Sequence, residues 1–237
     1  MVELKGMAMS LRLSARPRET EREPRRNVRI AVIGLLAGSA ACISAAPWVV
    51  GDSYSMVRLT VSESAAQGLG GGWVTRLGFV MLGVAVAVAS HVCSQRWGAA
   101  GRWMHRVYAA AVIAAAVFSD APWNGAPYDE AENALHSAAA ALTGVAFSLG
   151  VLAVGFGRGR PPPGMRIFDW VTVGASVVVP PAMYVFVAIE GLAQRSMFLV
   201  TFLWYGLEAG SGLRRGERGG PVEVHRATGA RPDRPDW

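Results

Sequence analysis

Apolar stretches alternate with short polar stretches along most of the chain. A bilayer core about 30 Å thick is crossed by roughly 20 helical residues. Six apolar runs approach that length, and they lack the polar face that a helix on the surface of a soluble protein shows. The sequence therefore predicts an all-α fold, a bundle of six transmembrane helices. The runs cover about residues 30–50, 74–94, 104–119, 135–156, 167–189 and 196–213.

The two ends of the chain differ from this apolar region. Residues 1–28 and 214–237 are rich in Arg, Glu, Pro and Gly and contain little apolar surface to pack. We expect two disordered cytoplasmic tails around one membrane domain, residues 29–213. The first apolar run also resembles a signal sequence ending at Cys42, but the five further runs favour a retained span.

Basic residues are concentrated in every second connection. Arginines precede the first run, follow the sixth, and occur between runs two and three and between runs four and five. The other connections contain few, chiefly Arg58, Arg76 and Arg195. Lysine and arginine accumulate on the cytoplasmic side of membrane proteins. Six spans with both termini in the cytoplasm satisfy this rule, and the acidic stretch at residues 118–136 then lies outside.

The composition supports a multi-pass protein of the cell membrane. Charged residues make up 17% of the chain and hydrophobic residues 52%, whereas about 25% of a typical soluble protein is charged. The formal net charge of +6 comes largely from arginines outside the apolar runs, without the interleaved aromatic residues typical of nucleic-acid binding. The expected partner is therefore the lipid bilayer and not a nucleic acid. Six tryptophans are expected at the membrane boundaries, Trp48, Trp73 and Trp123 outside and Trp97, Trp103 and Trp170 inside.

Candidate chemistry is concentrated in "FSDAPWNGAPYDEAENALH", residues 118–136. Asp129, Glu132 and His136 are spaced by three and then four residues, which places them on one face of a helix. The Glu132 and His136 pair offers an oxygen and a nitrogen to a metal ion. Alternatively, these carboxylates cap free amides at the start of a helix. The sequence does not identify a cofactor.

Other polar residues at the predicted outer boundary suggest a common site. Asp120 closes the third apolar run, Ser62 and Glu63 follow the first, and Arg195 lies near the start of the last. In one hypothesis His136 is a general base or metal ligand, and Asp120 or Glu132 orients it. Ser62 is then a nucleophile or hydrogen-bond donor. Arg195 and Glu63 would then bind a lipid or small-molecule ligand. The hypothesis predicts that His136 and Asp120 lie within about 10 Å, and we expect Arg195 to face them and to pair with a carboxylate.

Two classes of function remain open. One is a transport, sensing or structural component of the membrane, and the other is a membrane-embedded hydrolase acting on a lipid or envelope substrate. Pro180 and Pro181 in the fifth run favour the first class, because a broken helix can line a pathway. No strong catalytic signature supports the second. Four residues near the inner boundary are expected to pack or to reach toward water without forming a site: Asp169, Trp204, Tyr205 and Glu208.

The order of several short motifs resembles a family of bacterial and archaeal polytopic membrane proteins, domain of unknown function 998. The resemblance extends from residue 30 to about residue 209. It implies the six-span layout and no established reaction. It also marks Ser62, Glu63, Asp120, His136 and Arg195 as candidate family residues. The motifs are "TVSESAAQG", "FSDAPW", "ALHSAAA" and "GLAQRSMFLVTFLWYGLEA".

The predicted orientation can be tested by labelling single cysteines in intact cells. Cysteines introduced at positions 125 and 192 should react with an impermeant thiol reagent, because both connections are expected outside. A cysteine at position 162 should react only after permeabilisation. Labelling at position 162 in intact cells would reverse the orientation.

Overall fold

The computed structural model describes residues 19–51, 53–157 and 166–217. Within these ranges the protein is all-α, with six long helices and two short 3₁₀ helices. This confirms the all-α part of the predicted fold class. The elements in chain order are α2 (Glu19–Val50), η1 (Glu63–Ala65), α3 (Trp73–Val92), α4 (Ser94–Val117), α5 (Glu130–Gly157), α6 (Ile167–Val185), η2 (Val187–Ile189) and α7 (Glu190–Glu217).

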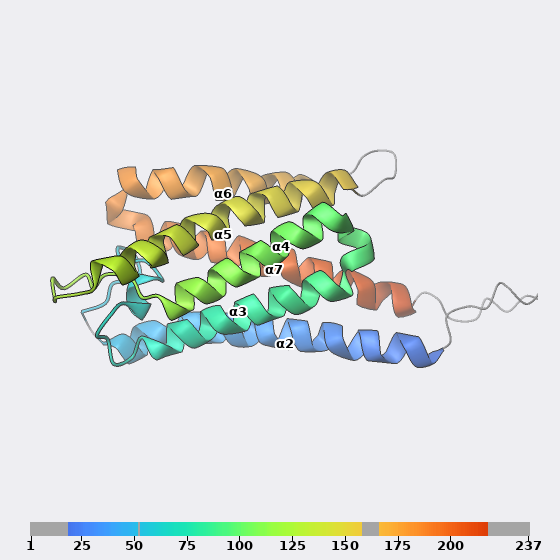
Figure 1. The fold of residues 1–237 in the computed structure, drawn as a ribbon, viewed down its shortest axis with the longest axis horizontal. Helices are drawn as coiled ribbons and strands as arrows, with labels where there is room; N and C mark the ends of the chain where they lie inside the picture. Colours follow the sequence, from blue (N-terminus) through green and yellow to red (C-terminus); the bar gives the residue numbers. More distant parts are fainter. Residues whose placement is uncertain (1–18, 52, 158–165, 218–237) are drawn as a thin grey trace, which may run out of the picture.

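The long helices form an up-and-down bundle in which neighbours in sequence also pack together (Figure 1). α7 additionally packs against α2, and this contact closes the ring of helices. The connections after α2, α4 and α6 lie at one end of the bundle, which we call the outer end. The start of α2, the junction between α3 and α4 and the end of α7 lie at the opposite, inner end. This alternation matches the pattern of basic connections in the sequence.

Four helices in the described part of the chain are long and apolar enough to cross a membrane. α4 and α7 do not meet the same criterion, although both are long, because arginines and carboxylates interrupt them. The number of six spans therefore stays a prediction. The four candidate spans are Arg26–Val50, Trp73–Val92, Glu130–Gly157 and Ile167–Val185.

Several helices begin earlier than the apolar runs predicted. α2 starts at Glu19 and so extends into the segment 1–28, for which a disordered tail was expected. Arg and Glu are good helix formers, which accounts for helix beyond the apolar run. α4 starts at Ser94, and its first turn is separated from the main helix by Gly98, whose φ of 66° favours glycine. Residues 1–18 and 218–237 of the predicted tails lie outside the described residues.

Aromatic side chains fill the inner half of the core. Trp204 and Tyr205 of α7 have no exposed surface, and they contact Trp97, Tyr108 and Phe147 from α4 and α5. In a bilayer, close packing and polar contacts, more than release from water, hold such helices together. Trp97 was expected at the inner membrane boundary, and this expectation is wrong. The bend at Gly98 turns its indole into the core, where 1% of the residue is exposed.

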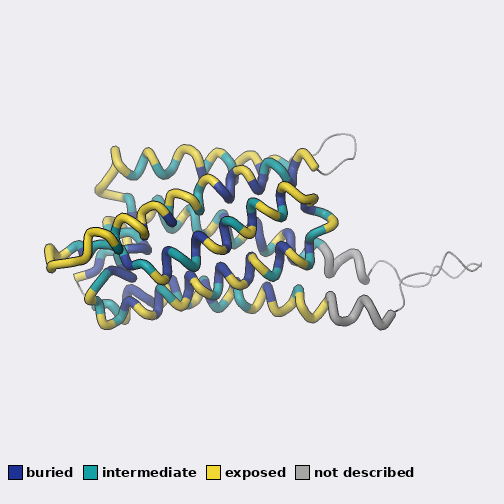
Figure 2. Tube along the Cα trace, viewed as in Figure 1, coloured by how far each residue is buried: buried dark blue, intermediate teal, exposed yellow. Residues whose placement is uncertain are grey.

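α6 is exposed along much of its length (Figure 2), and many of its exposed residues are apolar. Val171, Val177 and Val178 are each more than half exposed, as expected for contact with lipid. The residues that α6 buries are polar instead: Asp169, Thr172 and Ser176. Thus the fully buried positions of α6 are polar, while the partly buried Phe168 and Val173 pack against the apolar core.

The proline pair does not break α6. We expected a discontinuous helix at Pro180 and Pro181, but the helix continues through both to Val185. A proline removes one backbone hydrogen bond without necessarily ending a membrane helix, because neighbouring groups can satisfy the freed carbonyl. α6 therefore provides no broken helix that could line a pathway.

The close approach of α5 to α4 generates a prediction about stability. A Cβ atom on Gly150 would lie 2.7 Å from Cε1 of the buried His105 ring, whereas one on Gly144 of the same helix would meet nothing within 4 Å. Gly150→Ala should lower the free energy of unfolding by about 1–3 kcal/mol. Gly144→Ala should leave it unchanged or raise it slightly. Equal thermal unfolding of the two purified variants in detergent would contradict the packing described.

Candidate functional site at the outer end

The acidic loop begins where α4 ends and leads directly into α5. Phe118 follows α4 in an extended conformation, and residues 118–129 return the chain to the start of α5. The Asp129 carboxylate accepts hydrogen bonds from the amides of Ala131 and Glu132, at 2.8 and 3.1 Å. For Asp129 the helix-capping alternative is therefore confirmed. The capping bonds stabilise the first turn of α5.

The next polar residues of α5 bond to the end of α4 and to the loop. Glu132 Oε1 accepts a hydrogen bond from the amide of Ser119 at 2.7 Å, and Asn133 Oδ1 accepts one from the amide of Ala121 at 3.0 Å. His136 faces the same segment one turn later. Glu132, Asn133 and His136 thus all face the segment that runs from the end of α4 into the loop.

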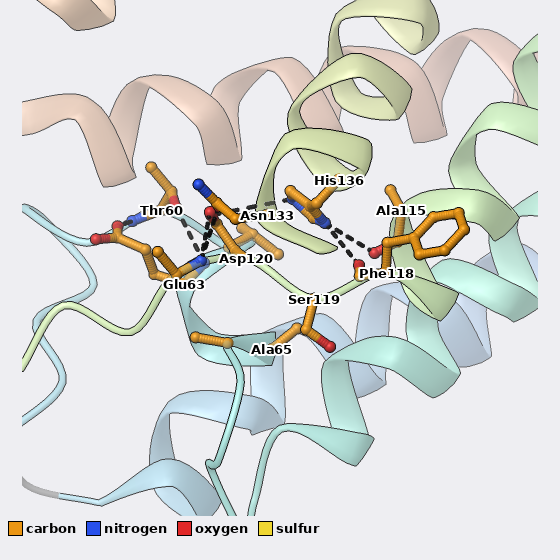
Figure 3. Close-up of polar contacts among 12 residues, drawn as sticks. Thr60, Glu63, Ala65, Ala115, Phe118, Ser119, Asp120, Asn133 and His136 are labelled. Atoms are coloured by element: carbon orange, nitrogen blue, oxygen red, sulfur yellow. Dashed lines mark hydrogen bonds and ion pairs between the residues drawn. The ribbon is translucent and has the colours of Figure 1, made fainter. Parts of the chain in front are cut away.

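The ring of His136 is fixed by two backbone carbonyls. Its Nδ1 lies 3.0 Å from the oxygen of Ala115 and 2.9 Å from the oxygen of Phe118 (Figure 3). Carbonyls only accept hydrogen bonds, so Nδ1 must carry the hydrogen, and neutral His136 has its lone pair on Nε2. Nε2 is buried and makes no hydrogen bond to the protein. The only charged partner described for it is Asp120, whose Oδ2 lies 3.9 Å away.

Asp120 and His136 therefore meet as predicted, well within about 10 Å. Burial raises the pKa of Asp120 above its ordinary value, and the nearby His136 and the Ala121 amide lower it in part. The Asp120 side chain is 23% exposed, whereas that of His136 is 3% exposed. Asp120 is thus the partly exposed member of the pair, and His136 is the buried one.

Glu63 and Ser62 do not join this pair. The Glu63 carboxylate accepts a hydrogen bond from the Thr60 amide at 2.6 Å, and the Thr60 hydroxyl accepts one from the Glu63 amide. Figure 3 shows this carboxylate turned toward Thr60 and away from His136. Ser62 lies at the start of η1, and among the described residues no hydrogen bond links it to Asp120 or His136. The catalytic role of Ser62 and the ligand-binding role of Glu63 stay predictions.

Arg195 has a different environment from the one we expected. Its guanidinium donates to the carbonyls of Met56, Leu59 and Gly191, and to the hydroxyl of Tyr54 at 2.6 Å. Within the described ranges no carboxylate pairs with it. Carbonyl oxygens replace the expected anion because the connection after α2 folds directly over the start of α7. Arg195 therefore fastens this connection to the bundle, and its binding of a substrate stays a prediction.

Two glutamines that the sequence analysis did not single out join the outer connections. Gln67 donates to the carbonyls of Ser119 and Asp129 and accepts a hydrogen bond from the Asp129 amide at 2.7 Å. Gln194 accepts a hydrogen bond from the amide of Val61. Glutamine is common in loops, and its partners here are backbone groups. The sequence thus contained no signal for these contacts.

The predicted metal pair has competing contacts. Glu132 is bonded to the Ser119 amide, and Nδ1 of His136 is bonded to carbonyls. Across residues 19–51, 53–157 and 166–217, no group of three or more His, Cys, Asp or Glu side chains is placed to hold a metal ion. Binding of a metal by Glu132 and His136 stays a prediction.

Comparison with known families identifies the family of this chain. A sequence model of the family described as protein of unknown function (DUF998) matches residues 25–209, which extend from α2 into α7. The chain belongs to the DUF998 family. The resemblance identified in the sequence is thus confirmed. No curated protein and no solved structure matches the chain significantly.

The inner end of this DUF998 protein contains buried charges that the sequence analysis underestimated. Asp169 and Glu208 were expected to pack or to reach toward water, and both are packed, with no exposed surface. Arg166 bridges them, with NH2 at 2.8 Å from an oxygen of each. Arg96 approaches the second oxygen of Glu208 at 3.4 Å. The inner end is therefore an ion-pair network, whose pairing the sequence analysis did not predict.

The raised pKa of Asp120 predicts a pH dependence of stability. The folded state binds this proton more tightly than the unfolded chain does, for which the ordinary value is 3.8. The free energy of unfolding should therefore fall as pH rises from about 3.8 through the raised pKa, and stay lower above it. Asp120→Asn should remove this contribution, so the variant gains stability relative to the wild type as pH rises. Chemical unfolding at several pH values measures the difference.

The exposed Glu130 at the start of α5 supplies the control. Glu130→Gln also removes one carboxylate from the same end of the molecule, but that residue is exposed. It should not change the pH dependence in the way Asp120→Asn does. If the free energy of unfolding depended on pH in the same way in both variants, the burial of Asp120 would not be the cause of the effect.

Proposed function

We propose that this chain is a six-span protein of the cell membrane with both termini in the cytoplasm, and that it serves transport or sensing through proton binding at its outer end. The up-and-down bundle and the four apolar helices support the membrane assignment. The alternation of basic connections supports the orientation. The charges in α4 and α7 are compatible with spans because the bundle interior shields those that are buried, including Glu208.

The observation that carries the proton-binding role is the free Nε2 of His136 beside the Asp120 carboxyl group. Nε2 is held at 3.9 Å from Oδ2, too far for a direct hydrogen bond but close enough for strong electrostatic coupling. A proton taken up by His136 would create an ion pair there, and its loss would remove that ion pair. Proton binding would thus change the attraction between α5 and the loop after α4.

The loop after α4 is also the part of the outer end that can transmit such a change. Gln67 joins it to the connection after α2, and Arg195 joins that connection to α7. A displacement of Asp120 would therefore be transmitted through existing hydrogen bonds to the loop after α4, the connection after α2 and the start of α7. Transmission to other helices is what sensing or transport requires.

A fluorophore on the outer loop tests the proposal. In the full chain, with Cys42 and Cys93 replaced by Ser, Ala126→Cys introduces an exposed attachment point within residues 118–129. Emission of an environment-sensitive label should change sigmoidally with pH in this background. His136→Gln and Asp120→Asn should abolish the change, and Glu130→Gln should retain it. The same pH response in all four proteins would contradict the proposal.

A membrane-embedded hydrolase is the second candidate, and the same nitrogen favours it. An imidazole whose Nδ1–H is oriented by carbonyls and whose Nε2 is free has the form of a general base. Against this role, neither Ser62 nor Arg195 is bonded to the pair. Purified protein supplied with vesicles of ester and amide lipids tests this reading. Hydrolysis that falls at least about 100-fold in His136→Gln would establish the enzyme, whereas equal rates in both proteins would exclude His136 as its base.

A further inference from the structure

Two arginines of α4 lie on the side of this helix that faces α3, toward the inner end of the bundle (Figure 1). Arg102 and Arg106 are one helical turn apart, and Ala109 and Ile113 continue the same face of α4. Gly83 of α3 lies directly against Ala109 and Ile113, so this face packs on α3. The two arginines therefore lie where the interface between α3 and α4 reaches the inner end.

Arg106 is fixed at this interface and is still exposed. Its Nε donates a hydrogen bond to the hydroxyl of Ser90, a buried residue in the last turn of α3, at 3.3 Å. Among the described residues, no hydrogen bond or ion pair involves the two terminal nitrogens of Arg106 or the guanidinium of Arg102, which is half-buried. The terminal nitrogens of Arg106 are thus held in position without a protein acceptor.

Other arginines at the inner end differ in this respect. Arg29 donates to the carbonyl of Ala209 at 3.0 Å, and Arg166 is bonded to Asp169 and Glu208. These guanidinium groups serve the packing of the protein itself. Arg102 and Arg106 have no such task in the described part of the chain, so their acceptors are to be sought in the surroundings.

The depth of the pair corresponds to the phosphate layer of a membrane. α3 has 20 residues, a length of about 30 Å, which matches the thickness of a bilayer core. Ser90 in its last turn therefore marks the inner boundary of that core. Trp103, between the two arginines in sequence, is 61% exposed, as is typical of tryptophan at this boundary. Arginine at this depth is stabilised when it pairs with a phosphate.

The charges at this end favour an anionic lipid over a zwitterionic one. Among the side chains that the structure describes there, the carboxylates are Asp169 and Glu208, and both are fully buried. The amine of a zwitterionic headgroup would meet the two arginines and no exposed carboxylate. An anionic headgroup lacks that amine, and its phosphate complements the arginines.

We propose that Arg102, Trp103 and Arg106, which we call the basic cluster, bind the phosphate of an anionic phospholipid in the inner leaflet. Arg106 donates to two phosphate oxygens through its terminal nitrogens, the geometry that guanidinium and phosphate groups form. Arg102 adds a second positive charge one turn away, and Trp103 packs against the glycerol region of the lipid. The inference rests on the membrane assignment proposed above, but not on proton binding at the outer end.

Native mass spectrometry of the full chain in detergent tests the inference. The probes are phosphatidylglycerol, which is anionic, and phosphatidylcholine with the same acyl chains. The wild type should bind one phosphatidylglycerol more tightly than one phosphatidylcholine. Arg106→Gln and Arg102→Gln should each weaken the binding of phosphatidylglycerol by at least about fivefold and leave that of phosphatidylcholine unchanged. Arg106→Lys should keep part of the preference, because it retains the charge and loses the planar fork.

The matched control is Arg26→Gln, which removes an exposed arginine from α2 at the same end of the molecule. It should leave the preference for phosphatidylglycerol unchanged. Three results would overturn the inference: the wild type shows no preference, the variant with both Arg102→Gln and Arg106→Gln retains it, or Arg26→Gln lowers it as much as Arg106→Gln does. Displacement of the lipid by an equal concentration of inorganic phosphate would also overturn it, since the site would then bind a free anion.

Thermal unfolding without added lipid verifies that each variant is folded, and Arg102→Gln and Arg106→Lys decide the question should Arg106→Gln not fold. Protein in detergent has no inner and outer solution, so the result does not depend on the predicted orientation. Loss of lipid preference with an intact pH response of the outer loop would refute this inference alone. The opposite result would refute only the proton-binding proposal. Recovery of the expressed chain outside the membrane fraction would refute both.

Discussion

The hydrogen bonds from Nδ1 of His136 to the carbonyls of Ala115 and Phe118 determine what the outer end of this protein can do. They fix the hydrogen on Nδ1 and leave Nε2 as the nitrogen that faces Asp120. They also satisfy carbonyls at the end of α4 that the helix cannot satisfy itself. The His136 side chain therefore binds the free carbonyls at the end of α4 and also presents a basic nitrogen to Asp120. A movement of the acidic loop would affect both contacts.

The same constraint acts at the inner end with different residues. Polar groups that a membrane bundle buries must find partners within the protein, because the bilayer core contains no water. The buried face of α6 meets this requirement through Asp169, which receives Arg166 and the N–H of Trp204. Glu208 on α7 receives Arg166 and Trp97. Polar networks thus hold the two ends of the bundle together. Aromatic side chains packed around Tyr205 fill the inner half of its core.

The sequence predicted contacts between residues that are close together in the chain better than contacts between residues that are far apart in it. Apolar runs and alternating basic connections predicted the helices and their order, and the nearness of Asp120 and His136 followed because both border one short loop. The partners of Arg195 are backbone carbonyls, which have no sequence signature. The pairing of Arg166 with Glu208 depends on how α6 packs on α7, and the inward turn of Trp97 depends on one glycine after it. Neither follows from local pattern.

The coupling of Asp120 to His136 is the central claim, and a double-mutant cycle measures it most directly. The free energies of unfolding of wild type, Asp120→Asn, His136→Gln and the double variant are compared in detergent at about pH 5 and about pH 8. The account predicts a favourable coupling energy of at least about 0.5 kcal/mol at the lower pH and a smaller value at the higher pH. Additive effects within about 0.3 kcal/mol at both pH values would contradict it.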